Sequence, residues 1–527
     1  MIKISKPLIA VVCCFVLSAA PALAFMPSGG VPSASGPLSE VATFAGAGGF
    51  DDAEEQAAAA EANFRFPFHV AALADGSVLV SDSSNHVIRR ILDGEVTVYA
   101  GFLYLDKNDA GLPVGALLDG TRETAVFNQP AGLAVDSRGN VFVADSGNHA
   151  IRKIDPQGVV TTVAGTGVMG YADGRADEAR FNHPQDVAVA PDGTLYVADT
   201  GNHAIRKIAP DGTVSTLNAL SERVVEVVPG YVVEAGDYQD GPLSEAKFNE
   251  PFALEWDRSG NLYVSDSGNH LIRYVDLAAG RVSTVAGTVR RDMYAEGALY
   301  AAGAYADGAA RQAGFHFPKG LAATDDGGLV IADSLNHTVR FLHDGTVTTL
   351  AGSMRAEHGF ADGVNGGNLL HNPTDVAIAG DQLLIADAYN QRIRLYSLYA
   401  LPEGAERDGI VDVALGNELI SFRSPVQLVR SRVMVPVGDI ASALGAQVSE
   451  TEGRVTVAPE QGIRLVFAAD DGVLRVVADD GSVSDVRMDA IPFFRNGTFY
   501  VPVRYLAEAL GFAVDWDGVT QTVILRK

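Results

Sequence analysis

The sequence predicts a mainly β protein: a six-bladed β-propeller closed by its N-terminal strand, followed by a small α+β domain of two strand–helix repeats. Three observations predict this fold class. One motif recurs six times, each copy contains four short β-type runs separated by turn residues, and the period changes after residue 401. At 527 residues the chain is also too long for a single ordinary core.

Composition and charge narrow the functional classes. Hydrophobic residues make up 47% of the chain and charged residues 20%, which is typical of a globular protein. The formal net charge of −26 argues against a nucleic-acid partner, because a phosphate-binding surface needs clustered basic residues.

The N-terminus is predicted to be a signal peptide over residues 1–24, followed by a linker over residues 25–40. Lys3 and Lys6 precede an apolar run, and Ala22-Leu23-Ala24 forms a small-residue cleavage site. Cys13 and Cys14 both lie inside this segment, so the mature chain is expected to contain no disulfide. The signal predicts a secreted or cell-envelope protein of bacterial type, with no transmembrane segment.

The repeats occupy residues 41–401. The shared aspartates are Asp82, Asp145, Asp199, Asp266, Asp333 and Asp387, with an asparagine three residues after each. The shared arginines, seven residues after each aspartate, are Arg89, Arg152, Arg206, Arg273, Arg340 and Arg394. Four antiparallel runs per copy predict one propeller blade each. The stretch VADSGNHAIRKI resembles the NHL-repeat family, and the resemblance implies a propeller over the whole repeat region.

The two ends of the repeat region predict a closed ring. The last copy lacks an outermost strand, and VATFAG at residues 41–46 has the sequence of that missing strand. Pairing Thr43 and Phe44 beside Ile393 and Leu395 would complete the sixth blade and remove an open sheet edge. An open solenoid is the alternative.

The residues that recur in every copy favour a structural role. Each aspartate is expected to cap a tight turn, each asparagine to adopt its strained backbone conformation, and each arginine to pair with the aspartate. Five turns also carry a histidine, but turns of neighbouring blades lie too far apart to share one metal ion. Most connections between blades carry an Asp-Gly motif. This motif has two interpretations: a turn packed on the neighbouring blade, or part of an acidic surface on the loop face.

Irregular positions are better candidates for a site. Three connections between blades are enlarged: residues 103–118, 218–235 and 288–304. They carry the candidate ligand-binding residues Tyr104, Tyr231, Tyr294, Tyr300, Arg290 and Arg291. A rim-covering role for these loops is the alternative. On the innermost strands, the candidate catalytic or cation-binding residues are Glu255, Asp186, His69 and Asp375. They would face the mouth of the central channel, where the alternative is that they are hydrogen-bonded channel residues.

Residues 402–412 are predicted to be a linker, and residues 413–527 a separate domain. RVMVPVGDIASALGAQV and TFYVPVRYLAEALGFAV are two copies of a strand–Pro–helix–Gly unit. The second copy resembles the copper amine oxidase N-terminal (stalk-like) domain. That resemblance implies an accessory module with a capacity for self-association. It implies no copper or quinone, because the metal ligands of those oxidases belong to a separate catalytic domain.

The functional expectation is a secreted binding or scaffolding protein that holds a protein, peptide or glycan on the loop face of its propeller. The alternative is a propeller hydrolase or lyase acting at the channel mouth, with a divalent cation as its one candidate cofactor.

Overall fold

The computed structural model describes residues 38–364, 367–399, 401–405, 409–416, 418–451, 453–459, 462–478, 480–518 and 520–526. The predicted signal peptide, with Cys13 and Cys14, and most of the linker after it lie outside these residues. Among the described residues, the helices are too short or too polar to cross a bilayer.

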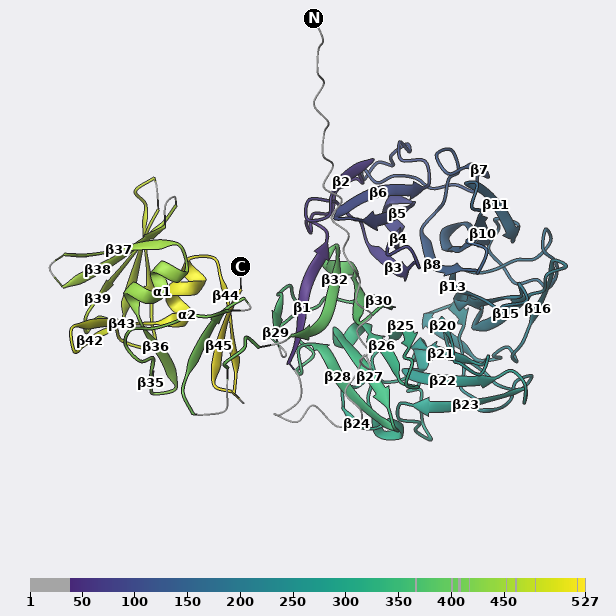
Figure 1. The fold of residues 1–527 in the computed structure, drawn as a ribbon. Coiled ribbons are helices and arrows are strands. Elements are labelled where there is room, and N and C mark those ends of the chain that lie inside the picture. Colours follow the sequence, from purple (N-terminus) through teal and green to yellow (C-terminus); the bar gives the residue numbers. More distant parts are fainter. Residues whose placement is uncertain are drawn as a thin grey trace, which may run out of the picture.

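Residues 38–364 and 367–399 form the ring of sheets on the right of Figure 1. Blade 1 contains β2 (Gln56–Ala58), β3 (Pro67–Ala72), β4 (Val78–Asp82), β5 (Val87–Leu92) and β6 (Glu95–Ala100). Blade 2 contains β7 (Gly120–Thr121), β8 (Pro130–Val135), β9 (Val141–Asp145), β10 (Ala150–Ile154) and β11 (Val159–Ala164). Blade 3 contains β12 (Gly174–Arg175), β13 (Pro184–Val189), β14 (Leu195–Asp199), β15 (Ala204–Ile208) and β16 (Thr213–Thr216).

The other three blades repeat this plan. Blade 4 contains β19 (Gly241–Pro242), β20 (Pro251–Trp256), β21 (Leu262–Asp266), β22 (Leu271–Asp276) and β23 (Arg281–Ala286). Blade 5 contains β24 (Gly308–Ala309), β25 (Pro318–Ala323), β26 (Leu329–Asp333), β27 (Thr338–His343) and β28 (Thr346–Gly352). Blade 6 contains β29 (Gly363–Val364), β30 (Pro373–Ala379), β31 (Gln382–Asp387), β32 (Arg392–Tyr399) and β1 (Leu38–Ala45).

The predicted six-bladed architecture is confirmed, with one addition. Each blade has a short fifth strand at its rim, and in blades 2 to 6 this strand begins at the glycine of the Asp-Gly motif. A single turn of 3-10 helix joins the second and third long strands of each blade. These turns are η1 (Ser83–Asn85), η2 (Ser146–Asn148), η3 (Thr200–Asn202), η4 (Ser267–Asn269), η6 (Ser334–Asn336) and η7 (Ala388–Asn390), and η5 (Ala310–Gln312) lies at the rim of blade 5.

The ring is closed by the N-terminal strand, as predicted. β1 pairs antiparallel with β32, with Ala42 opposite Leu395 and Ala45 opposite Ile393. The strand begins at Leu38, three residues before the predicted start. This closure gives the outer edge of β32 a partner and so removes an edge open to aggregation.

The core of the propeller lies between consecutive blades. The cluster around Val70 and Val80 of blade 1, for example, includes Leu384 and Ile393 of blade 6. A phenylalanine near the start of each of the first five copies is almost fully buried in such a cluster. These residues are Phe64, Phe127, Phe181, Phe248 and Phe315. Because each blade buries its faces against its neighbours, the ring stabilises all six sheets together.

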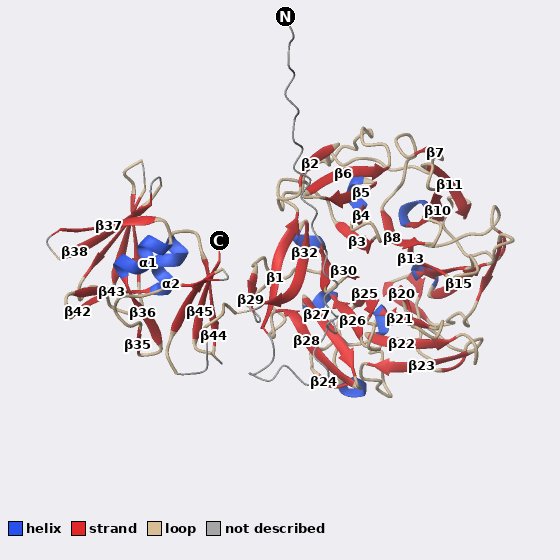
Figure 2. Cartoon of the chain, viewed as in Figure 1, coloured by secondary structure: helices blue, strands red, loops and turns tan. Residues whose placement is uncertain are grey.

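The C-terminal unit contains both α-helices of the described chain (Figure 2). α1 (Val437–Ala443) and α2 (Val503–Ala509) follow β36 (Arg432–Pro436) and β43 (Thr498–Pro502), which pair with each other. The remaining strands are β33 (Asp412–Leu415), β34 (Glu418–Leu419), β35 (Gln427–Val429), β37 (Ala446–Thr451), β38 (Arg454–Pro459), β39 (Arg464–Ala468), β40 (Val473–Val477), β41 (Val483–Arg487), β42 (Phe493–Arg495), β44 (Ala513–Asp517) and β45 (Thr522–Arg526). The two predicted strand–helix units are confirmed, and the sheet β37–β41 lies between them in the sequence.

The C-terminal unit packs on blade 6 beside the closing strand. Ile524 joins Leu38, Val364 and Tyr399 in one buried cluster. Arg526 pairs with Glu40 of β1 and, at 2.9 Å, with Asp515 of β44. The second domain therefore holds the strand that closes the ring.

Candidate functional site

A buried polar network lies in every blade, and blade 2 shows its geometry. Asp145 accepts hydrogen bonds from the backbone N–H of Asn128 at 2.8 Å and from the side chain of Asn148 at 2.8 Å. Its other contact is Arg152, at 2.7 Å. The expected side-chain cap on the following turn is absent, since Asp145 instead holds the residue that leads into its own blade.

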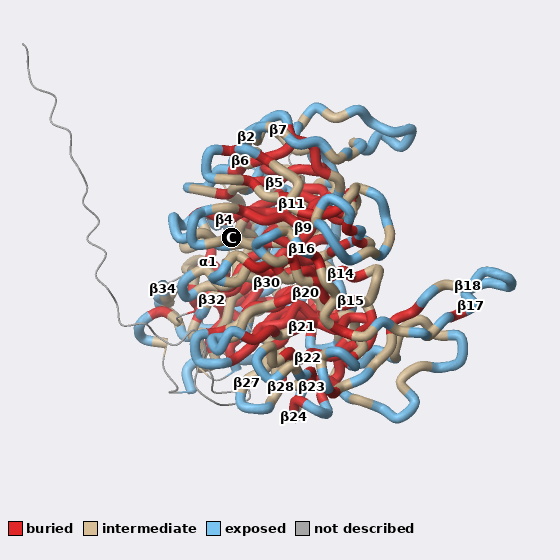
Figure 3. The backbone as a smooth tube through the Cα atoms, turned by 90° about the vertical axis from the view of Figure 1, so that its right-hand side faces the viewer, coloured by how far each residue is buried: buried red, intermediate tan, exposed pale blue. Residues whose placement is uncertain are grey.

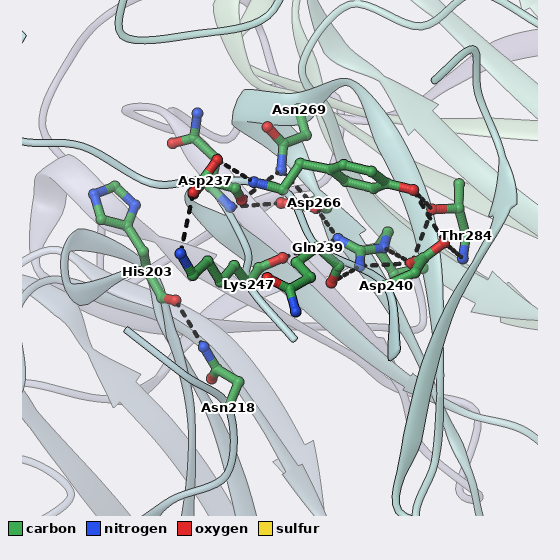
Figure 4. A network of polar contacts seen from close by, with 12 residues as sticks. His203, Asn218, Asp237, Gln239, Asp240, Lys247, Asp266, Asn269 and Thr284 are labelled. Carbon is green, nitrogen blue, oxygen red and sulfur yellow. Dashed lines mark hydrogen bonds and ion pairs between the residues drawn. The ribbon is translucent and has the colours of Figure 1, made fainter. Parts of the chain in front are cut away.

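Each shared arginine joins its aspartate to a second acidic group at the rim. Arg152 lies 2.8 Å from Asp119 of the Asp-Gly motif, and blades 3 to 6 have the same bridge at 2.5–2.7 Å. Figure 4 shows this network in blade 4, where Asp240 also accepts the backbone N–H of Thr284. Blade 1 differs, because Arg89 lies 3.5 Å from Asp82 and 3.8 Å from Glu54.

These twelve repeated residues hold each blade together. All six aspartates and all six arginines have no exposed surface. Burial raises the pKa of Asp145 to about 6 although Arg152 opposes it. A buried carboxylate and its paired cation are unavailable to a ligand, which favours a structural role for this network.

The repeated histidines join each blade to the next. The Nδ1 atoms of His86, His149, His203, His270 and His337 accept backbone N–H groups of the following blade, at 2.9–3.2 Å. In blade 6, Gln391 takes this place and accepts from Phe66 at 2.6 Å, which continues the series across the closure. The left-handed residue of each turn is this histidine or glutamine, and not the asparagine as expected.

The histidine contacts require the neutral imidazole, because a protonated Nδ1 cannot accept a hydrogen bond. Burial lowers the pKa of His203, His270 and His337 to about 4. Between that value and the unfolded value of about 6.5, the unfolded chain binds more protons at these groups. Their contribution to stability is therefore complete above pH 6.5 and declines as the pH falls towards 4.

Replacing His203 by glutamine, in imitation of Gln391, is expected to keep thermal stability at neutral pH and to reduce its loss in acid. Calorimetric Tm values for both proteins between about pH 7 and about pH 5 measure the difference. The raised pKa of Asp145 and its counterparts has the opposite effect, because it stabilises the folded protein as the pH falls. The variant is therefore compared with the wild type, which shares this effect. Equal losses of Tm in the two proteins would contradict the role of His203.

The predicted catalytic candidates lie around the propeller axis, where each carboxylate bonds to the next blade. Asp186 accepts the N–H of Leu254 at 2.8 Å, and Asp375 accepts that of Val70 at 2.9 Å. Glu255 accepts the N–H of Ala323 at 3.1 Å. These hydrogen bonds join the innermost strands of consecutive blades, as the histidines join the turns.

Two glycines make room for the aspartates. A Cβ atom added to Gly132 would lie 2.1 Å from Oδ1 of Asp186, and one added to Gly320 would lie 2.1 Å from Oδ1 of Asp375. His69 sits between the two carboxyls, with Nε2 3.8 Å from Asp186 and Nδ1 3.4 Å from Asp375.

Burial shifts the pKa values of the axial groups away from their ordinary values. Burial raises the pKa of Asp186 to about 8 and that of Glu255 to about 7, and it lowers the pKa of His69 to about 3. At neutral pH this leaves Asp186 and His69 mostly uncharged. Across the described ranges, no three His, Cys, Asp or Glu side chains are grouped to hold a metal ion.

Sequence analysis missed a cluster that joins the innermost strands of blades 1, 4 and 5. We call Phe68, Phe252 and Lys319 the axial cluster; each is the residue after the first proline of its innermost strand. The rings of Phe68 and Phe252 are 5.4 Å apart, and Lys319 Nζ lies 5.0 Å from the centre of Phe252 and 6.0 Å from that of Phe68. Lys319 is the one charged residue among the six equivalents, which include Ala131, Gln185 and Thr374.

The enlarged connections hold the six predicted ligand-binding residues in different settings. Tyr104 is 69% exposed and Tyr231 is 61% exposed, whereas Arg290 and Arg291 are exposed in the third connection. The hydroxyl of Tyr294 donates a hydrogen bond to the side chain of Asn269, and that of Tyr300 donates to Glu250 at 2.8 Å. Both tyrosines therefore pack on the propeller. The structure therefore does not bring the six together at one point.

The second enlarged connection forms a separate hairpin, β17 (Val224–Val228) and β18 (Tyr231–Glu234). Figure 3 shows this hairpin projecting beyond the body of the propeller. Arg223 anchors its base: it donates to the carbonyls of Gly236, Ala298 and Leu299 at 2.6–2.7 Å and stacks on Tyr294. Arg223 was not among the predicted residues.

The closed ring of repeat-built blades defines a β-propeller protein. The NHL-repeat model matches residues 127–154 and 181–208, and the copper amine oxidase N-terminal domain matches residues 413–525. The propeller thus contains NHL repeats at these residues, and a copper amine oxidase N-terminal domain follows it.

Known relatives match about half of this chain. Protein SUPPRESSOR OF QUENCHING 1, chloroplastic, of Arabidopsis thaliana is 32% identical over 290 residues, covering 53% of this chain and 26% of the relative. NHL repeat-containing protein 2 of Homo sapiens is 30% identical over 294 residues, covering 50% of this chain and 38% of the relative. The chain thus spans well under half the length of either protein.

The solved structures to which the chain is similar include an auxiliary nutrient binding protein from Bacteroides thetaiotaomicron. It has 13% identity and a TM-score of 0.47, over 68% of this chain and 76% of that one. A streptogramin B lyase has 11% identity and a TM-score of 0.39, over 68% of this chain and 98% of that one.

Proposed function

We propose that this protein is a secreted or cell-surface binding protein that holds a protein partner on the loop face of its propeller, with the hairpin β17–β18 as the main contact. The observation that carries the proposal is the exposure of apolar side chains on this hairpin. Val224, Val228, Tyr231 and Val232 are 55–61% exposed. Contiguous exposed apolar groups on a folded protein are typical of interaction surfaces.

The hairpin favours a protein over a glycan. Its two strands form a sheet of their own, so in the described chain the outer edge of each strand has no strand partner. A two-stranded hairpin is marginal alone in water, and pairing with a partner strand would satisfy its edge groups. The exposed Glu222, Glu226 and Glu234 nearby favour a partner segment whose apolar residues are flanked by basic ones.

Other features support a binding role and an external location. The axial carboxylates bond to backbone groups of the next blade, which favours binding over catalysis at the axis. The signal-like residues 1–24 favour secretion. The C-terminal domain, packed on blade 6, would position the propeller for its partner.

The triple variant Val228→Thr, Tyr231→Thr and Val232→Thr is expected to weaken partner binding at least about tenfold. It should not lower Tm, because these side chains are exposed. The partner is isolated from the envelope and secreted proteins of the producing cell, purified, and titrated against both proteins by calorimetry.

The matched control is Val168→Thr. This residue is 53% exposed on a regular connection and is expected to leave the affinity unchanged. If every purified partner, including a second copy of the chain or a glycan, bound the triple variant as tightly as the wild type, the proposal would fail.

A further inference from the structure

The axial cluster presents a cation over an aromatic surface. Within the described residues, Lys319 Nζ forms no hydrogen bond, and it lies instead over the rings of Phe252 and Phe68. The side chains of Lys319 and Phe252 are partly exposed, while Phe68 is 9% exposed. The ammonium thus has donors available to a bound molecule.

The nearest charge of opposite sign is already engaged. Glu250 accepts a hydrogen bond from Tyr300 at 2.8 Å, and it attracts the Lys319 ammonium without forming a direct ion pair. Burial lowers the pKa of Lys319 to about 8, so the amine stays mainly protonated at neutral pH. In a chain of net charge −26, a positive group on the axis is a local exception.

We propose that Phe68, Phe252 and Lys319 form a second binding site, for a ligand that carries a single carboxylate on a flat or apolar body. The carboxylate accepts hydrogen bonds from Lys319, and the body lies against the ring of Phe252. One ammonium suits one carboxylate, whereas phosphate recognition uses several donors or a guanidinium fork. Glu250 would also repel a dianion more strongly than a monoanion.

Two sources supply this chemistry: the C-terminal end of a peptide and a uronic acid. The probes are N-acetylphenylalanine with its amide, and galacturonate with galactose. At least one acid is expected to bind with a Kd of about 1 mM or lower, and its uncharged counterpart at least about tenfold more weakly. The acid that binds identifies the source.

Lys319→Gln is expected to weaken binding of that acid at least about tenfold, because it keeps a polar side chain but removes the charge. Lys153→Gln, at a partly exposed lysine on β10, is the matched control and is expected to have no effect. Phe252→Leu is a second variant. It is expected to weaken binding of the acid, because it removes the aromatic ring against which the ligand lies. Circular dichroism verifies that all three variants are folded.

Equal binding of acid and uncharged counterpart, full affinity in Lys319→Gln, or no binding of either acid would each overturn the site. The hairpin triple variant should bind the acid with unchanged affinity, since it lies away from the axis. A failure of this site and a failure of the protein-binding surface are therefore distinguishable.

Discussion

Replacing Arg273 by methionine is expected to lower the free energy of unfolding by about 3–5 kcal/mol, because the change leaves a buried carboxylate without its cation. Arg273 has no exposed surface and lies 2.6 Å from Asp266 and 2.7 Å from Asp240. Its guanidinium also donates to the carbonyl of Gln239 at 2.8 Å. The guanidinium of Arg273 also lies 4.9 Å from the centre of the Phe248 ring. Methionine replaces it with an apolar group of similar length and removes the donors. Chemical denaturation of both proteins measures the loss.

Blade 1 provides the matched control. Arg89 lies 3.5 Å from Asp82, and its Nε and Nη2 atoms have no hydrogen-bond partner. Arg89→Met should therefore cost clearly less than Arg273→Met. If both variants lost the same free energy of unfolding, the rim carboxylate and the short contacts of Arg273 would contribute nothing to stability.

Joining the closing strand to blade 6 by a disulfide is expected to stabilise the propeller strongly. Ala42 and Leu395 are paired residues on β1 and β32, and both are partly buried. Opposite residues of an antiparallel pair have Cα atoms about 4.5–5.5 Å apart, which a disulfide can span. The closed loop would contain most of the ring, so the chain-entropy model gives a stabilisation of up to about 5 kcal/mol.

The repeat made the propeller predictable from sequence. Each copy placed its β-type runs between turn residues, and residues 41–46 matched the strand that the last copy lacked. The two-residue rim strands such as β7 carry too little periodicity to be predicted. The hairpin β17–β18 was read as part of a loop, because its strands pair only with each other and belong to no repeat.

The candidate site was less predictable, because its parts converge only when the ring closes. Phe68 and Phe252 come from blades 1 and 4, and their rings touch across the axis. Lys319 could have been noticed as the one charged residue at its repeat position, but its aromatic surroundings are absent from the local sequence. The histidines were visible in five of the six turns, yet the N–H group from which each accepts a hydrogen bond lies 34–47 residues further along the chain.

The paired cysteines also give the most direct measurement of the account's central claim, that the first strand closes the ring. Ala42→Cys with Leu395→Cys is made in the chain without residues 1–24, which removes Cys13 and Cys14. Oxidation should form an intramolecular disulfide and raise Tm, and reduction should reverse the rise. Ala42→Cys with Ser397→Cys, two residues out of register, should form it poorly. Failure of the in-register pair to cross-link, or equal cross-linking of both pairs, would contradict the closed propeller.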